Sequence, residues 1–147
     1  MTTMTESRTA YLTTTPWRDT YQTSRLHFFV PVLPPRELSP NGRFHWARRA
    51  AQVKNYRNSV GVMAGNARQL TGWPAPAKAR VKLTFIFRSA TRRDPDNLLA
   101  SFKSGIDGMV DGGVIIGDDS ERLIIKPPEI VVSRRLESGV HIVVEAI

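Results

Sequence analysis

Two short acidic segments carry the side chains of this sequence that are best suited to catalysis. The segment RRDPDN contains Asp94 and Asp96, and the segment GDDSE contains Asp118 and Asp119. Carboxylates that converge on one point repel one another unless a cation or a shared proton compensates. A hard divalent ion with oxygen ligands is the natural compensation. If the chain brings these segments together, they predict a Mg²⁺ site.

The chemistry that fits such a site is the cleavage of a phosphodiester. A metal held by aspartates lowers the pKa of a bound water, stabilises the charge that grows on the phosphate and orients the leaving oxygen. Carboxylates alone would repel a polyanion, but Arg92 and Arg93 stand beside them. We expect these two arginines to offset the repulsion and to contact a nucleic acid backbone.

A lysine follows the first acidic segment at helical spacing. Lys103 comes seven residues after Asp96, about two helical turns or roughly 10 Å along the axis. Helical side chains lean toward the N-terminus, so Lys103 is expected to point back at the acidic residues. There it would neutralise transition-state charge on a phosphate. A solvated surface lysine fits the same spacing equally well.

Each aspartate also has an ordinary structural interpretation. Asp96 suits a helix cap, Asp94 a turn, and Asp118 and Asp119 an exposed loop. For any one residue that interpretation is the better one, but their arrangement around a single predicted helix favours a shared site.

Several other kinds of site are excluded. Leu98 and Leu99 stand where an EF-hand loop needs polar ligands and a glycine, and no GxxxxGK[ST] motif occurs. The absence of cysteine rules out disulfides, thiolate zinc sites and cysteine nucleophiles.

Length and charge limit the organisation and the partners. The 147 residues fit a single domain, and the formal net charge of +8 favours nucleic acid as the partner. No apolar run approaches the roughly 20 residues that a membrane span requires. The first residues lack the apolar core of a secretion signal, so we expect a cytoplasmic location. We interpret residues 1–24 as a loosely ordered arm and residues 25–147 as the folded domain.

Hydrophobic periodicity predicts the elements that must position the acidic residues. Alternation predicts strands over residues 81–88 and over residues 140–146. The β-branched and aromatic residues of RLHFFVPVL predict another strand, and LIIK and EIVVSRR also suit strands. In the last strand Val140, Ile142, Val144 and Ala146 are expected to face inward, after a hairpin turn at LESG. A helix is expected over residues 97–110, capped by Asp96 or Asn97.

A longer helix is predicted from Arg43 to about Leu70. Its apolar stripe would comprise Trp46, Ala50, Val53, Val60, Met63, Ala67 and Leu70. The basic residues Arg48, Arg49, Lys54 and Arg57 lie mostly off that stripe and form either a solvated face or one that contacts phosphates. His45, beside Trp46, is a further candidate for a DNA contact.

The acidic segments and the helix between them together form a specific pattern. A D-x-D-N motif opens a helix and is followed by a D-G-x-V turn and a D-D pair. The segment RRDPDNLLASFKSGIDGMVDGGVIIGDDSE resembles the core signature of RusA-type Holliday junction resolvases. The segments LPPRELSPNGRFHW and GVHIVVEA support the resemblance, which covers most of the chain after residue 24.

The resemblance implies a fold and an activity. The fold is α/β (α+β), with a small mixed β-sheet packed against two main helices in one domain. The activity is that of a homodimer, dependent on magnesium or manganese, that makes paired incisions across a four-way DNA junction. An isologous dimer would present two equivalent sites to opposed strands.

The resemblance also assigns roles to residues. Asp94 and Asp96 become metal-binding catalytic acids, with Asp119 as the third and Asp118 close by. Arg92, Arg93 and the basic helix become the DNA contacts. The family often has a catalytic lysine four residues after the second aspartate, where this chain has Ala100. Lys103, one turn further along, is the expected substitute.

Three functions therefore remain in competition. The leading one is a structure-selective endodeoxyribonuclease that resolves Holliday junctions and related branched DNA in recombination and repair. The second is a non-catalytic protein that binds branched DNA, in which the aspartates are structural. The third is a metal-dependent enzyme that acts on nucleotides or on other branched nucleic acids.

Overall fold

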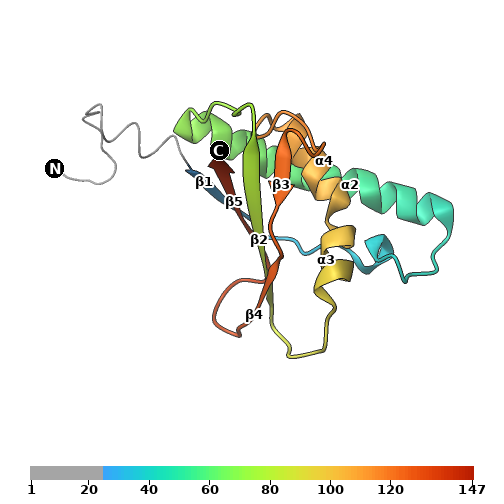
Figure 1. Cartoon of the computed structure of the whole chain (residues 1–147). Coiled ribbons are helices and arrows are strands. Elements are labelled where there is room, and N and C mark those ends of the chain that lie inside the picture. Colours follow the sequence, from blue (N-terminus) through green and yellow to red (C-terminus); the bar gives the residue numbers. More distant parts are fainter. Residues whose placement is uncertain (1–24) are drawn as a thin grey trace.

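A mixed five-stranded sheet with helices on one face forms the domain (Figure 1). The computed structural model describes residues 25–147, so the predicted arm over residues 1–24 lies outside the described residues. The α/β (α+β) prediction is confirmed. The strands are β1 (Arg25–Val30), β2 (Ala79–Phe87), β3 (Leu123–Ile125), β4 (Glu129–Val132) and β5 (Gly139–Ala146). The helices are the 3-10 turn η1 (Arg36–Leu38), α2 (Trp46–Thr71), α3 (Pro95–Ser101) and α4 (Lys103–Asp111).

The central strand β2 organises the sheet. It pairs antiparallel with β5, which in turn pairs with β1, and on its other edge it pairs in parallel with β3 and then β4. Alternate residues of the three long strands face the helices and are buried. The predicted inward alternation of the last strand is borne out, since Val140, Ile142 and Val144 are fully buried.

Helices α2 and α4 cross this buried face in close contact. Gly108 of α4 and Gly112, the C-cap of α4, lie against α2, and a Cβ on Gly112 would come within 2.7 Å of the Cβ of Ala64. Any larger side chain at these two positions would push the helices apart. The backbone of α4 is therefore fixed against α2, which positions the segments at both ends of α4.

The apolar stripe predicted for the long helix is wrong at both ends. The helix begins at Trp46 and buries Tyr56, Val60 and Ala64. Trp46 and Leu70 are 76% and 87% exposed. A helix of 26 residues is about 39 Å long, so its end turns reach past the sheet that the middle turns cover. No helix in the described part of the chain is long and apolar enough to cross a membrane.

The single helix predicted over residues 97–110 is two helices. The chain breaks at Phe102, with φ −88° and ψ 2°, and the ring of this residue is fully buried. It packs edge-on against Tyr56 and Phe85, with ring centroids 5.8 and 6.0 Å apart. Burial of this ring anchors the junction of α3 and α4 to the core.

The hairpin predicted at LESG is also wrong. Strands β4 and β5 do not pair with each other, because they lie on opposite edges of β2. The segment between them therefore crosses from one side of the central strand to the other. The residues of this segment suit a tight turn, but β4 pairs instead with residues 84–87 of β2, which follow the stretch of β2 that pairs with β3.

Candidate functional site

Helix α3 begins at the first predicted acidic segment, and Asp94 is its N-cap. Asp94 has extended backbone angles, and its Oδ1 accepts a hydrogen bond of 2.9 Å from the backbone N–H of Asp96. Pro95 occupies the first helical position, where its missing N–H costs nothing. The predicted cap at Asp96 or Asn97 is therefore wrong by two or three residues, and Asp94 has a structural role.

This helical start separates the two predicted ligands. Residues two apart point the same way along a strand, but they do not share a face on a helix. Asp94 lines a pocket of about 220 Å³ together with Arg93 and Asn97. Asp96 lines a different pocket, of about 390 Å³. The expected convergence of Asp94 and Asp96 on one point is not seen.

The second pocket gathers side chains from α3, α4, the loop before β3 and β3 itself, and we call it the acidic pocket. It is lined by Asp96, Leu99, Ala100, Lys103, Ile106, Asp118 and Ile125. The ammonium of Lys103 lies 3.7 Å from Oδ2 of Asp118, which is too long for a strong hydrogen bond. Three of the predicted site residues, Asp96, Lys103 and Asp118, therefore come together here.

Lys103 reaches this pocket although its helix is not continuous with that of Asp96. It is the first residue of α4, directly after the break at Phe102, and its side chain still lines the pocket. Ala100, which stands where the family often has a lysine, lines the same pocket. The expectation that Lys103 lies near the acidic residues is confirmed, while its catalytic role stays a prediction.

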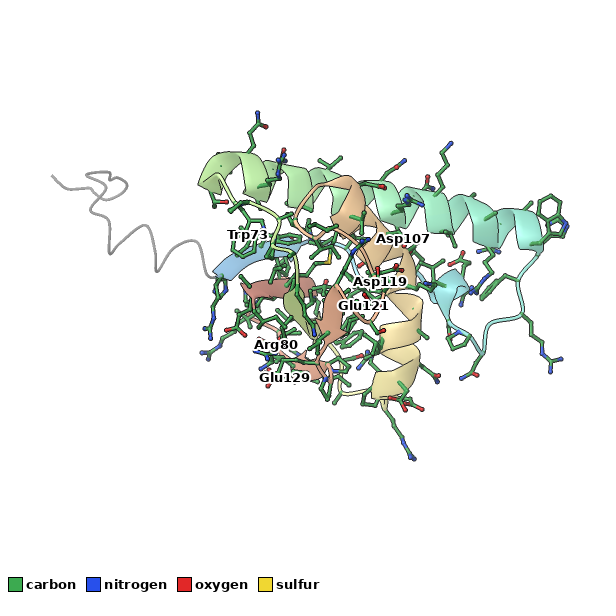
Figure 2. The ribbon with its side chains drawn as sticks, turned by 45° about the horizontal axis from the view of Figure 1, so that its top comes forward. Trp73, Arg80, Asp107, Asp119, Glu121 and Glu129 are labelled. Carbon is green, nitrogen blue, oxygen red and sulfur yellow. The ribbon has the colours of Figure 1, made fainter. Side chains whose placement is uncertain are left out.

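Asp119, the predicted third ligand, is occupied within its own turn. Its Oδ1 accepts a hydrogen bond of 3.0 Å from the backbone N–H of Glu121, and its Oδ2 lies 3.7 Å from the guanidinium of Arg122. Figure 2 labels Asp119 and Glu121 in the loop between α4 and β3. Asp119 does not line the acidic pocket, whereas its neighbour Asp118 does.

The predicted metal cluster is not assembled. Over residues 25–147, no three His, Asp or Glu side chains lie close enough together to hold a metal ion. Asp96 and Asp118 alone share a pocket. Two carboxylates are enough for Mg²⁺, because this ion is usually held by one or two carboxylates, with water and substrate phosphate completing its six ligands.

Most of the predicted DNA contacts have partners within the chain. Arg57 binds both carboxylate oxygens of Asp111, at 2.6 and 2.9 Å, and this pairing raises the pKa of Arg57 and lowers that of Asp111. Arg93 stacks on Phe87, with its guanidinium carbon 3.6 Å from the ring centroid, and it donates to carbonyl groups of its own loop. Such residues hold the fold as well as carrying charge.

Of the remaining basic residues, two are bonded within the chain and two are exposed without an ion pair. Arg48 bonds to Glu37, and Arg49 donates to the carbonyl oxygens of Glu37 and Ser39. Arg92 and Lys54 are exposed and form no ion pair with any residue that the structure describes. These two cations are the most available for a phosphate.

The basic start of α2 adjoins the acidic pocket. Arg49 lines a pocket of about 210 Å³ together with Lys103, Ser104 and Asp107. Lys103 and Ala100 line both pockets, so the two cavities share a wall. His45 caps α2, since its Nδ1 accepts a hydrogen bond of 3.2 Å from the backbone N–H of Ala47. The start of α2 is therefore separated from the acidic pocket by the wall that Lys103 and Ala100 form.

The face of the sheet away from the helices carries a second group of charges, which we call the sheet face. Glu145 accepts hydrogen bonds of 2.9 to 3.1 Å from Arg80 and Arg25, which lower its pKa. His27 and His141 lie with ring centroids 5.6 Å apart, and burial followed by the charge of His27 lowers the pKa of His141. Spacing in the sequence does not show that Glu145 meets Arg25 and Arg80, because the three residues lie on three different strands.

Comparisons with known proteins do not identify a family. No protein-family profile matches the chain. A protein of Xylella fastidiosa (strain Temecula1 / ATCC 700964), described as uncharacterized, is 39% identical over 99 residues. The aligned residues make up 64% of this chain, and the chain covers 60% of that protein. The chain thus spans less than two thirds of this relative, and the similarity assigns no function.

Proposed function

We propose that this chain is a magnesium-dependent endonuclease for branched DNA, with its reaction centre in the acidic pocket. One observation carries the proposal. Asp96 and Asp118, which are 22 residues apart in the sequence, line a single pocket beside Lys103 on a chain of net charge +8. A paired acidic site within a basic surface suits a substrate that is itself a polyanion.

Each side chain of the pocket has a distinct task in this proposal. Asp96 and Asp118 supply the oxygen ligands for Mg²⁺, which when bound lowers the pKa of a water and balances charge on the phosphate. Lys103 holds a positive charge at the pocket wall, where it stabilises the additional negative charge of the transition state. Arg92, Lys54 and Arg49 bind flanking phosphates and thereby orient the scissile bond.

The substrate and the assembly follow the resemblance to RusA-type resolvases. The proposed substrate is a four-way junction or related branched DNA, cut during recombination or repair in the cytoplasm. A homodimer would place two equivalent acidic pockets against opposed strands of a junction with approximate two-fold symmetry. Mn²⁺ is expected to replace Mg²⁺, because it also accepts oxygen ligands.

The decisive experiment is cleavage of a synthetic four-way junction in the presence of Mg²⁺. Wild type should give symmetric nicks, and Asp96→Asn or Asp118→Asn should slow cutting by about 100-fold or more while junction binding is retained. Glu137→Gln, an exposed carboxylate between β4 and β5, is the matched control and should cut normally. Random degradation by wild type, or normal cutting by both aspartate variants, would overturn the proposal.

Lys103 is tested separately from the aspartates. Lys103→Met keeps the length of the side chain but removes its charge, and we expect cleavage at saturating Mg²⁺ to fall about tenfold to 100-fold. Stability should be nearly unchanged, because the lysine is exposed and its contact with Asp118 is long. A variant that cuts at the rate of wild type would show that this lysine is only a surface residue.

A second candidate function is a branched-DNA-binding protein without catalysis. Two observations favour it. Asp94 accepts a backbone hydrogen bond as the N-cap of α3 and Asp119 accepts one within its own turn, and no group of three ligands forms in residues 25–147. Titration with Mg²⁺ separates the candidates. A site that binds the ion in the folded state raises the thermal midpoint of wild type but not that of Asp96→Asn, whereas a protein without a site shows no such difference.

A further inference from the structure

The most unusual exposed surface outside the acidic pocket lies where the chain enters α2. Trp46 is 76% exposed, although a tryptophan side chain normally buries a large apolar area. Figure 1 shows the first turns of α2 reaching beyond the sheet and α3. The ring is therefore presented to solvent at an extremity of the molecule, and the core gains nothing from it.

A second ring stands beside this tryptophan in a fixed position. The centroids of His45 and Trp46 are 5.6 Å apart and their planes are inclined by 30°. The Nδ1 of His45 accepts the hydrogen bond from the N–H of Ala47, and this contact fixes the orientation of the imidazole. The two rings form one exposed aromatic surface, which we call the ring pair.

The surroundings of the ring pair are strongly basic. Residues 36–49 contain four arginines and one acidic residue, Glu37. Glu37 is largely buried, and its carboxylate is bonded to Arg48. Arg43, next but one to His45 in the sequence, is exposed. The local charge therefore favours an anionic partner over an apolar protein surface.

This segment is also held rigidly in place. Arg36 and Arg48 both lie against the ring of Phe44, with guanidinium carbons 5.7 and 5.4 Å from its centroid. Arg49 donates to the carbonyl oxygens of Glu37 and Ser39 and so ties the loop to α2. An ordered aromatic surface loses little conformational entropy when a ligand stacks on it.

We propose that the ring pair binds an unpaired base of a nucleic acid by stacking, while Arg43 and its neighbours bind the adjacent phosphates. Aromatic side chains combined with cations bind single-stranded nucleic acid in this way, and every base offers a π-face. Bases within a paired duplex are already stacked and do not offer that face. The inference rests on the proposed function in one respect, since a branch point is where a DNA substrate exposes such bases.

The test compares the affinities of the full chain for two probes. One is a short single-stranded oligothymidylate and the other is a fully paired linear duplex, each followed by fluorescence anisotropy at fixed salt. Trp46→Ala should weaken binding of the single strand about tenfold and leave the duplex almost unchanged. Trp46→Tyr should restore most of the lost affinity, because a smaller aromatic ring still stacks.

Leu70→Ala is the matched control, because Leu70 is an equally exposed apolar residue of α2, about 36 Å away along the helix. It should bind both probes as wild type does. Equal affinity of Trp46→Ala and wild type for the single strand would overturn the inference. So would a loss that is the same for single strand and duplex, since that would reflect charge or folding rather than stacking.

These outcomes are independent of cleavage. If wild type cuts no junction but Trp46→Ala still loses affinity for the single strand, the proposed nuclease fails and the ring pair stands. If junctions are cut and Trp46→Ala binds the oligothymidylate normally, the nuclease stands and the ring pair fails.

Discussion

The acidic pocket and the sheet face hold charges in opposite ways. On the sheet face, Glu145 is bonded to Arg25 and Arg80, and Glu129 is 3.0 Å from the ammonium of Lys82. In the acidic pocket, Asp118 has a lysine at 3.7 Å. No hydrogen bond or ion pair reaches the carboxylate of Asp96 from any residue that the structure describes.

This difference separates charges that stabilise the fold from charges that are available to a ligand. A carboxylate with two guanidinium donors has its acceptors filled and its pKa lowered, so it gains little from a cation. Carboxylates that share a pocket without such donors retain free oxygens, and an added cation relieves their repulsion. Two carboxylates share one cation, Lys103, in the acidic pocket, whereas cations outnumber carboxylates on the sheet face.

The largest expected effect concerns what holds the pocket in place. Phe102→Ala removes the buried ring at the junction of α3 and α4 and should destabilise the protein by about 3 to 5 kcal/mol. The measurement is the midpoint of urea unfolding at constant slope. Leu70→Ala, at an exposed position, should change stability by less than about 0.5 kcal/mol. Similar losses in the two variants would mean that the pocket does not depend on the core.

A middle-sized effect tests the two roles of Asp94. Asp94→Ala removes the cap of α3 and should cost about 1 kcal/mol in thermal or urea unfolding, whereas Asp94→Asn keeps an equivalent acceptor and should cost little. Because Asp94 lines a different pocket from Asp96, we expect Asp94→Asn to slow junction cleavage only about tenfold. A loss as large as that of Asp96→Asn would place Asp94 among the metal ligands. A carboxylate that caps a helix would then also be available to a ligand.

The smallest effect belongs to the sheet face and depends on pH. The folded-state pKa of Glu145 lies below the ordinary value of 4.5, so its stabilising contribution is present above that pH and is lost as the pH falls through the folded-state pKa. Glu145→Gln should therefore lower the thermal midpoint at pH 7 and match wild type in strong acid. Its cleavage rate should stay within about twofold of wild type. A larger loss of cleavage would show that the sheet face also serves the reaction.

Much of the fold was predictable because burial imposes simple periods. Alternation marked β2 and β5 correctly, since one face of each is covered and the other is not. Trp46 and Leu70 were misassigned because periodicity identifies a face of a helix but not the length of the core beneath it. The break at Phe102 accompanies the packing of its ring against Tyr56 and Phe85, which are distant in the sequence and meet it only in the folded chain.

The candidate site was predictable by segment and less so by residue. Both acidic segments were identified, and Lys103 was expected near them, because helical spacing limits where a side chain can lie. Nothing in the sequence tells which of Asp118 and Asp119 turns into the pocket, since both suit a turn. Pro95 was the available signal at the other segment, because proline at a first helical position places Asp94 before the helix and Asp96 within it.

The two prolines between β3 and β4 have a consequence for self-association. Residue 126 donates to the carbonyl oxygen of Val81, and β4 resumes the pairing with β2 at Glu129, so Pro127 and Pro128 lie where one strand gives way to the next. Neither proline carries an N–H, and the outer rim of the sheet therefore offers an interrupted row of donors to a passing chain. Such an interruption disfavours the edge-to-edge strand pairing between molecules that leads to aggregation.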